Sequence, residues 1–159
     1  MYNIVIQKPE ENMNYDDLNE NLAAIIDGIP HTVANLANAS ALLWENLDRL
    51  NWAGFYLRQG DKLILGPFQG KVACVEIGWG NGVCGTAAAQ DKTQVVPNVH
   101  LFSGHIACDS ASNSEIVVPL HKDGQVAGVL DIDSPEFDRF SQEDKAGLEG
   151  FAKIIEKVL

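Results

Sequence analysis

Apolar side chains recur at helical spacing in two N-terminal segments, residues 15–27 and 31–50. Recurrence every three to four residues is typical of an amphipathic helix that buries one face. Pro30 separates the two segments, so we predict two helices and not one. The apolar stripe predicted for the second helix consists of Val33, Leu36, Ala37, Leu43, Trp44, Leu47 and Leu50.

After these helices the pattern changes to short aromatic and β-branched runs. NWAGFYLR at 51–58 and KLILGPF at 62–68 are joined by QGD, which predicts a β-hairpin. KVACVEI at 71–77 predicts a third strand. The segment GWGNGVCGTAAAQDK at 78–92 predicts a glycine-rich turn that leads into a short helix, and TQVV at 93–96 predicts a brief strand.

Residues 97–113 form the longest predicted loop. A loop of this length in a small domain is usually functional or disordered, and its aromatic, His and Cys residues argue against disorder. Two strands follow, EIVVPL at 115–120 and QVAGVLDID at 125–133. A last helix is predicted from about Ser141, because SQED provides an N-cap and acids in the first turn. This order of elements predicts an α+β sandwich around a central antiparallel sheet.

Three carboxylates lie in these last two strands, where a core strand should carry only hydrocarbon. Side chains alternate along a strand, so Val129, Asp131 and Asp133 share one face. The KDG turn favours a three-residue loop with a G1 bulge, which places Glu115 opposite Asp131. A cation or a metal then lies between the carboxylates, or one of them is protonated. The alternative is that this face meets solvent at a strand end, but the face also carries Ala127 and Val129.

Composition and charge exclude several classes of protein. A chain of 159 residues, 46% hydrophobic and 21% charged, fits one soluble domain with one core. The sequence has no run of about 18 apolar residues that could span a membrane. The start MYNIVIQKPEENMN lacks the basic and apolar regions of a secretory signal, so we expect a cytoplasmic protein. A net charge of −11 with scattered Lys and Arg argues against a nucleic-acid partner.

The three cysteines are an odd number in a chain without an export signal, which argues against a structural disulfide framework. They are free thiols, metal ligands or redox groups. Cys74 is expected in the middle of a strand, as a small buried hydrophobe. Cys84 opens the short helix, where the helix dipole can stabilise a thiolate, and Cys108 lies in the polar loop. An alternative zinc site would use His100, His105, Cys84 and Cys108. Because no two of these ligands form a close pair at two-residue spacing, a redox role is favoured.

Five motifs occur in order between about residue 51 and the C-terminus: NWAGFY, LGPFQGKVACVEI, GNGVCG, GHIACDSASNSEIVVPL and GVLDIDSPEFDRF. In these motifs and in its three cysteines the chain resembles the free methionine-(R)-sulfoxide reductases, a family of GAF-domain enzymes. The resemblance implies a single GAF domain over residues 1–159. In such a domain the N- and C-terminal helices cover one side of an antiparallel sheet, and a ligand pocket lies under loops on the other side.

The resemblance also implies roles for individual residues. Cys108 is expected to be the catalytic cysteine, Cys74 the main resolving cysteine, and Cys84 a second thiol that can also resolve. Trp52 and Tyr56 are expected to line the substrate pocket.

The three carboxylates complete the implied site, with Glu115, Asp131 and Asp133 holding the substrate. Asp133 is the first choice for the acid that protonates the sulfoxide oxygen, and Glu115 is the second. The implied reaction, which belongs to the response to oxidative stress, reduces free L-methionine (R)-sulfoxide through a cysteine sulfenic acid and a disulfide. The resemblance also implies that thioredoxin recycles the disulfide and that no cofactor or metal takes part, and it suggests a homodimer that the sequence itself does not show. Two alternatives remain open, a sensory GAF domain that only binds a small ligand and a zinc-binding regulator.

Overall fold

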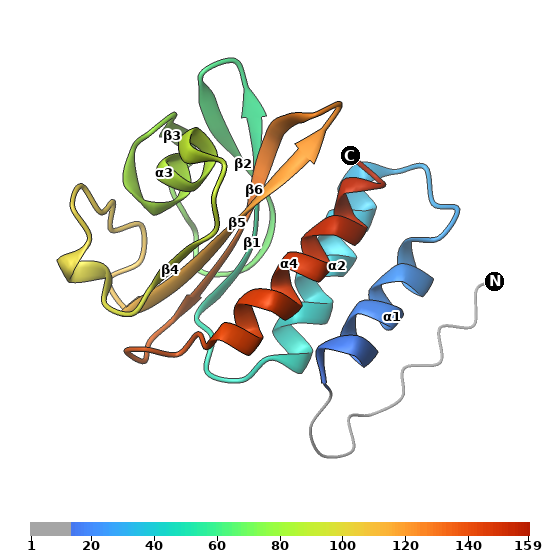
Figure 1. Cartoon of the computed structure of the whole chain (residues 1–159), viewed down its shortest axis with the longest axis horizontal. Coiled ribbons are helices and arrows are strands. Elements are labelled where there is room, and N and C mark those ends of the chain that lie inside the picture. The colour runs from blue at the N-terminus through green and yellow to red at the C-terminus, as the bar shows by residue number, and fades with distance from the viewer. Residues whose placement is uncertain (1–13) are drawn as a thin grey trace.

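The computed structural model describes residues 14–159 (Figure 1). The expectation about a secretory signal concerns the first residues of the chain, and residues 1–13 lie outside this range. The helices are α1 (Tyr15–Ile26), α2 (Thr32–Asn46), α3 (Gly82–Gln90), α4 (Gln142–Glu156) and the 3-10 helix η1 (Val99–Leu101). The strands are β1 (Trp52–Gln59), β2 (Lys62–Gly70), β3 (Glu76–Gly78), β4 (Gln94–Val96), β5 (Ser114–Lys122) and β6 (Gln125–Ser134). None of the helices in this range is long and apolar enough to cross a membrane.

The six strands form one antiparallel sheet in the order β3-β2-β1-β6-β5-β4. Helices α1, α2 and α4 pack together on one face of the sheet, and α3 lies on the other face with the loop of residues 97–113 (Figure 1). The predicted α+β architecture is therefore confirmed. Helix α4 also begins where the sequence predicts, since Ser141 and Asp144 form a capping box at its N-terminus.

The buried face of α2 differs from the prediction. Val33, Ala37 and Trp44 of the predicted stripe are exposed, and the helix ends at Asn46, before the last two positions of that stripe. The buried positions are Asn35, Leu36, Ala39, Ser40 and Leu43. The stripe was misplaced because a polar residue occupies the core face. The buried hydroxyl of Ser40 donates to two backbone carbonyl oxygens, which removes the cost of its burial.

The predicted third strand is mostly wrong, because residues 71–75 are irregular and β3 contains only the last part of the run. β2 ends at Gly70, whose φ of 129° turns the chain out of the sheet. The Tyr56 hydroxyl then donates to the carbonyl oxygen of Cys74 at 2.8 Å, and the Cys74 sulfur is bonded to Cys108. These two contacts hold the segment over the pocket face of the sheet and not in the plane of the sheet.

The turn between β5 and β6 is shorter than predicted. Asp123 and Gly124 both have positive φ, 53° and 75°, and Lys122 pairs with Gln125. Two consecutive residues of positive φ define a two-residue type I′ turn, for which Asp-Gly is a preferred sequence. The predicted three-residue loop with a G1 bulge is therefore wrong.

A bulge also shifts the register of the β5–β6 pair between Leu120 and the next residue. Glu115 consequently faces Asp133, and Asp131 faces Val117, whereas the sequence predicted that Glu115 faces Asp131. The difference is two positions along β6. Because side chains alternate with a period of two, all three carboxylates remain on the predicted common face.

Candidate active site

The three carboxylates lie on the face of the sheet opposite to α1, α2 and α4. Glu115 and Asp131 are 7% and 6% exposed, and Asp133 is half-buried. Burial raises the pKa of Glu115 well above its usual value, and the charges of Asp131 and Asp133 raise it further. Burial raises the pKa of Asp131 to about 6 and also raises the pKa of Asp133, on which Asp131 acts in the same direction. At neutral pH the cluster therefore holds protons that isolated carboxyl groups would have lost.

One oxygen of Asp131 and one of Asp133, the Oδ1 atom in each case, is buried without a hydrogen-bond partner among residues 14–159. A buried carboxylate oxygen without a partner is costly. The two atoms are thus acceptors available for a bound cation or a hydrogen-bond donor.

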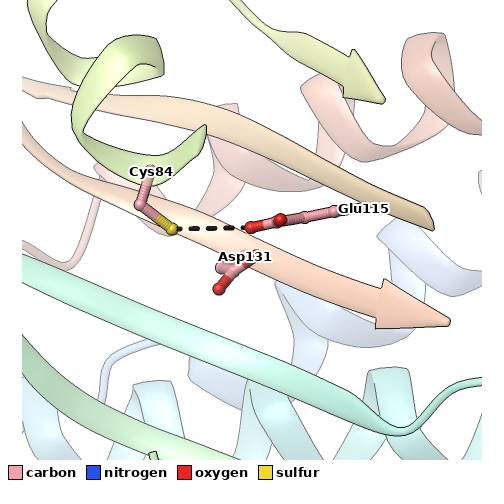
Figure 2. A group of neighbouring side chains, drawn as sticks. All are labelled: Cys84, Glu115 and Asp131. Atoms are coloured by element: carbon pink, nitrogen blue, oxygen red, sulfur yellow. Dashed lines mark hydrogen bonds between the residues drawn. The ribbon is translucent and has the colours of Figure 1, made fainter. Parts of the chain in front are cut away.

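Cys84 lies in the first turn of α3 and points at the carboxylates (Figure 2). Its Sγ atom is 3.9 Å from Oε1 of Glu115. Burial raises the pKa of the Cys84 thiol, and the charges of Asp131 and Glu115 raise it further. The effect expected from the helix dipole is therefore outweighed, because burial next to carboxylates favours the neutral thiol.

Cys84, Glu115 and Asp131 each offer one ligand atom, and these atoms lie within 4.8 Å of one another. They are the residues that could hold a metal ion in the described part of the chain. The predicted alternative of a zinc site is different, and its four residues are not brought together. The Cys108 sulfur is in a disulfide, and Nε2 of His100 is hydrogen-bonded to Asn113.

A disulfide joins Cys74 and Cys108, whose Cα atoms are 5.5 Å apart. This separation is in the usual range for the bond. Cys74 is therefore not the inert hydrophobe that its predicted strand position suggested. The two cysteines come from the irregular segment after β2 and from the loop before β5, and the bond links these segments above the carboxylates.

Aromatic side chains of β1 form one wall of the site, since Trp52 and Tyr56 line the cavity as predicted. The Trp52 ring stacks on Tyr56 at 5.8 Å and on Phe68 of β2, which does not line the cavity, at 5.0 Å between centroids. Trp52 donates from Nε1 to the carbonyl oxygen of Lys71, three residues before Cys74. The aromatic wall thus also anchors the segment that carries Cys74.

A polar anchor, missed from the sequence, holds the loop that carries Cys108. The Asp109 carboxylate accepts hydrogen bonds from the Ala111 backbone at 2.9 Å and from Nδ2 of Asn51 at 3.0 Å. The backbone hydrogen bond is the largest cause of the lowered pKa of Asp109, followed by the bond from Asn51. Asx turns of this kind are a local signal, but the contact to Asn51 spans 58 positions and leaves no trace in the sequence pattern.

These groups enclose a cavity of about 40 Å³ that is lined by every predicted site residue except Cys74. The loop residue His105 also lines it, with Nε2 3.9 Å from Oε2 of Glu115. The arrangement therefore combines a cysteine that forms a disulfide, carboxyl groups with raised pKa values and an apolar aromatic wall around one small space.

The fold and this site define the class of the protein. The family model of the GAF domain matches residues 21–159, which is most of the chain. The chain is therefore a GAF-domain protein that carries a cysteine pair at its ligand pocket.

Individual similar proteins identify the family within the GAF-domain proteins. The free methionine-R-sulfoxide reductase of Escherichia coli (strain K12) is 57% identical over 145 residues, which cover 91% of this chain and 88% of that protein. The reduced form of fRMsr from Staphylococcus aureus is 54% identical with a TM-score of 0.90, covering 96% and 99% of the two chains. The free methionine-R-sulfoxide reductase of Neisseria meningitidis in complex with its substrate is 44% identical with a TM-score of 0.88, covering 91% and 87%. The chain belongs to the free methionine-R-sulfoxide reductase family.

Proposed function

We propose that the protein reduces free L-methionine (R)-sulfoxide to L-methionine with cysteine chemistry. The observation that carries this proposal is the Cys74–Cys108 disulfide at a pocket that also contains two buried carboxyl groups and a half-buried one. Relatives at up to 57% identity bear the name of this activity, which supports the same assignment.

In the first step the Cys108 thiolate attacks the sulfoxide sulfur. The oxygen accepts a proton and is transferred from the methionine sulfur to the Cys108 sulfur, so the sulfoxide S–O bond breaks, Cys108 becomes a sulfenic acid, and methionine leaves as the thioether. The acid must hold a proton at neutral pH, which the raised pKa values of Asp133 and Glu115 support. We propose Asp133 as this acid, with Glu115 as the second candidate.

The carboxylates also provide the partner for the substrate ammonium. With Asp133 as the acid, the unpartnered Oδ1 atom of Asp131 offers an acceptor for the ammonium, two positions away on β6. A bound ammonium would neutralise the ionised Asp131 and supply a donor to it. The indole of Trp52, stacked between two rings, offers an apolar surface for the S-methyl group.

In the second step the Cys74 thiol condenses with the sulfenic acid of Cys108, which releases water and forms the disulfide. We propose that Cys74 is the main resolving cysteine, because the structure contains its bond to Cys108. Cys84 is a secondary thiol in this proposal. Its raised pKa keeps it protonated, and a bond to Cys108 would require a different position of the loop.

The disulfide ties the loop that carries Cys108 to the segment after β2, beside the cavity that Cys108 lines. We propose that substrate binds after the disulfide is reduced and the Cys108 loop has moved outward. A protein dithiol such as thioredoxin would return the enzyme to this state, which requires a reducing compartment, proposed to be the cytoplasm. The homodimer implied by the family resemblance remains part of this proposal.

The proposal is tested by incubating the reduced protein with free methionine (R)-sulfoxide and thioredoxin while reductant consumption is followed. We expect stoichiometric formation of methionine and catalytic turnover, and no reaction with the free (S)-sulfoxide as the control. A sensory GAF domain would bind a ligand without consuming reductant. Absence of turnover with the (R)-sulfoxide would therefore exclude the reductase.

A further inference from the structure

Exposed aliphatic side chains lie on both sides of the Cys74–Cys108 disulfide. Val72 is 88% exposed and Val75 is 65% exposed, and they flank Cys74 two positions before and one position after it. Ile106, two positions before Cys108, is 39% exposed. Val72 and Ile106 also lie at the cavity that Cys108 lines. We call Val72, Val75 and Ile106 the disulfide face.

The backbone under this face is held firmly. The Tyr56 hydroxyl donates to the Cys74 carbonyl, Trp52 donates to the Lys71 carbonyl, and the Leu65 amide donates to the Val75 carbonyl at 2.9 Å. Neither Val72 nor Val75 packs into either hydrophobic core cluster. The fold thus fixes this segment in a position that leaves two valines in solvent. Single exposed valines are ordinary, but several beside one reactive bond indicate a binding surface.

The charge of the two segments supports the same interpretation. KVACV at 71–75 and GHIAC at 104–108 contain no acidic residue, and the acids that directly follow them are engaged by other groups. Glu76 is ion-paired with Lys62 at 2.9 Å, and Asp109 accepts hydrogen bonds from Asn51 and Ala111. An apolar surface whose neighbouring acids are already paired suits a partner that must bring a thiolate close to the bond.

We propose that the disulfide face is the docking site of the protein dithiol that reduces the Cys74–Cys108 bond. This inference rests on the proposed function, because it assumes that the disulfide is recycled. A protein dithiol is the occupant because the surface contains the bond that such a reductant must contact, and exchange requires direct attack on a sulfur. A small thiol needs no surrounding apolar area.

The geometry assigns Cys74 as the sulfur that is attacked. Cys108 lines the cavity and Cys74 does not, so attack on Cys74 leaves the Cys108 thiolate at the pocket, where the next substrate binds. The reductant thiolate bonds to Sγ of Cys74, the Cys74–Cys108 bond breaks, and Cys108 leaves as a thiolate. The second thiol of the reductant then loses its proton and attacks its partner sulfur, which releases Cys74 as a thiolate that takes up a proton. The two electrons of one dithiol thus reduce one disulfide.

The main test measures how fast the oxidised protein is reduced, with no methionine sulfoxide present, so that its failure is separate from failure of the reductase proposal. Reduced thioredoxin and dithiothreitol are compared on the wild type, Val75→Asp and the neutral, isosteric Val75→Thr. Val33→Asp is the matched control, because Val33 is 71% exposed on α2, on the opposite face of the sheet. We expect the thioredoxin rate constant to fall about tenfold for Val75→Asp and about threefold for Val75→Thr, with the dithiothreitol rate unchanged. Val33→Asp should match the wild type in both.

Three outcomes would overturn the docking site. The first is that both Val75 variants are reduced by thioredoxin as fast as the wild type. The second is that Val75→Asp loses as much rate with dithiothreitol as with thioredoxin, and the third is that Val33→Asp loses as much rate with thioredoxin as Val75→Asp does. A change from dimer to monomer in Val75→Asp, measured by sedimentation, would assign the face to a second copy of the chain.

A trapping experiment tests the site of attack. A thioredoxin variant that lacks its second cysteine forms a stable mixed disulfide, and we expect peptide mapping to find it on Cys74. Attachment to Cys108 would contradict the proposed approach.

Discussion

The two faces of the sheet are formed by the same strands but differ in chemistry. On β5 and β6, Ile116 and Ile132 point into a core that α1, α2 and α4 cover, and that core consists of apolar side chains. Their neighbours Glu115, Asp131 and Asp133 point to the other face, where the buried cluster includes a cysteine next to the carboxyl groups. A period of two along each strand therefore places the stabilising residues and the reactive residues on adjacent positions.

The two faces contribute to the free energy of unfolding with opposite signs. Burial of the apolar face contributes roughly 1.5 to 3 kcal/mol for each large side chain. Burial of the carboxyl groups has the opposite sign, as the raised pKa of Asp131 and Glu115 indicates. The apolar packing under the helices thus offsets the free-energy cost of burying carboxyl groups on the pocket face.

The largest expected effect concerns the substrate amine. If the carboxylate of Asp131 pairs with the ammonium, N-acetylmethionine (R)-sulfoxide leaves a buried charge without its partner. Such a loss typically costs roughly 3 to 5 kcal/mol, or about two to four powers of ten in kcat/KM. The measurement compares kcat/KM for the free and acetylated sulfoxides at the same thioredoxin supply. Comparable values would show that the acids do not recognise the amine.

A substitution on the helix-covered face should affect stability alone. Phe151 of α4 is fully buried in that core, and Phe151→Ala should lower the free energy of unfolding by about 3 to 5 kcal/mol. Activity per folded molecule should stay near that of the wild type. Val33→Ala, at a position of α2 that is 71% exposed, is the control and should change stability by less than about 0.5 kcal/mol. Denaturant unfolding and kcat/KM, measured on the same samples, would refute the separation of the two faces if both changed together.

A substitution on the pocket face should raise the free energy of unfolding, whereas the substitution on the helix-covered face lowers it. The pKa of Asp131 rises from the usual 3.8 to about 6 in the folded protein, so the native state binds more protons than the unfolded state between these values. The stability contributed by this group is present below pH 3.8 and is lost as the pH rises through about 6. Asp131→Asn should therefore stabilise the protein by about 1 to 3 kcal/mol at pH 7 and have little effect below pH 4, while kcat/KM falls. Urea titrations at the two pH values measure this, and a destabilised variant at pH 7 would contradict it.

Local signals allowed much of this molecule to be predicted from its sequence. The capping box at Ser141, the hairpin signals and the alternation along β6 act over a few residues, and all three are found in the structure. The prediction of a common face for the carboxylates is confirmed although the predicted register is wrong, because the shorter turn and the bulge near Leu120 each move the pairing by one position, two in total. The prediction of the face was thus more robust than the prediction of the individual pairs.

Contacts between distant segments account for what could not be predicted. The position of residues 71–75 depends on the hydroxyl of Tyr56 and on the bond to Cys108, 34 positions away from Cys74. The anchor between Asn51 and Asp109 is of the same kind. The sequence pattern contains no sign of such contacts, so the strand predicted at 71–77 was mostly wrong. For Cys84, burial next to the carboxyl groups outweighs the stabilisation of a thiolate that we expected from the helix dipole.

The central claim is that the pocket face carries out thiol chemistry centred on Cys108. The most direct test starts from protein that has been reduced and then transferred into buffer without thiols. This protein is mixed with free methionine (R)-sulfoxide in the absence of any reductant. The account predicts one equivalent of methionine per active site for the wild type and for Cys74→Ser, and none for Cys108→Ser, because the sulfenic acid forms only on Cys108. Formation of a full equivalent by Cys108→Ser would contradict the account.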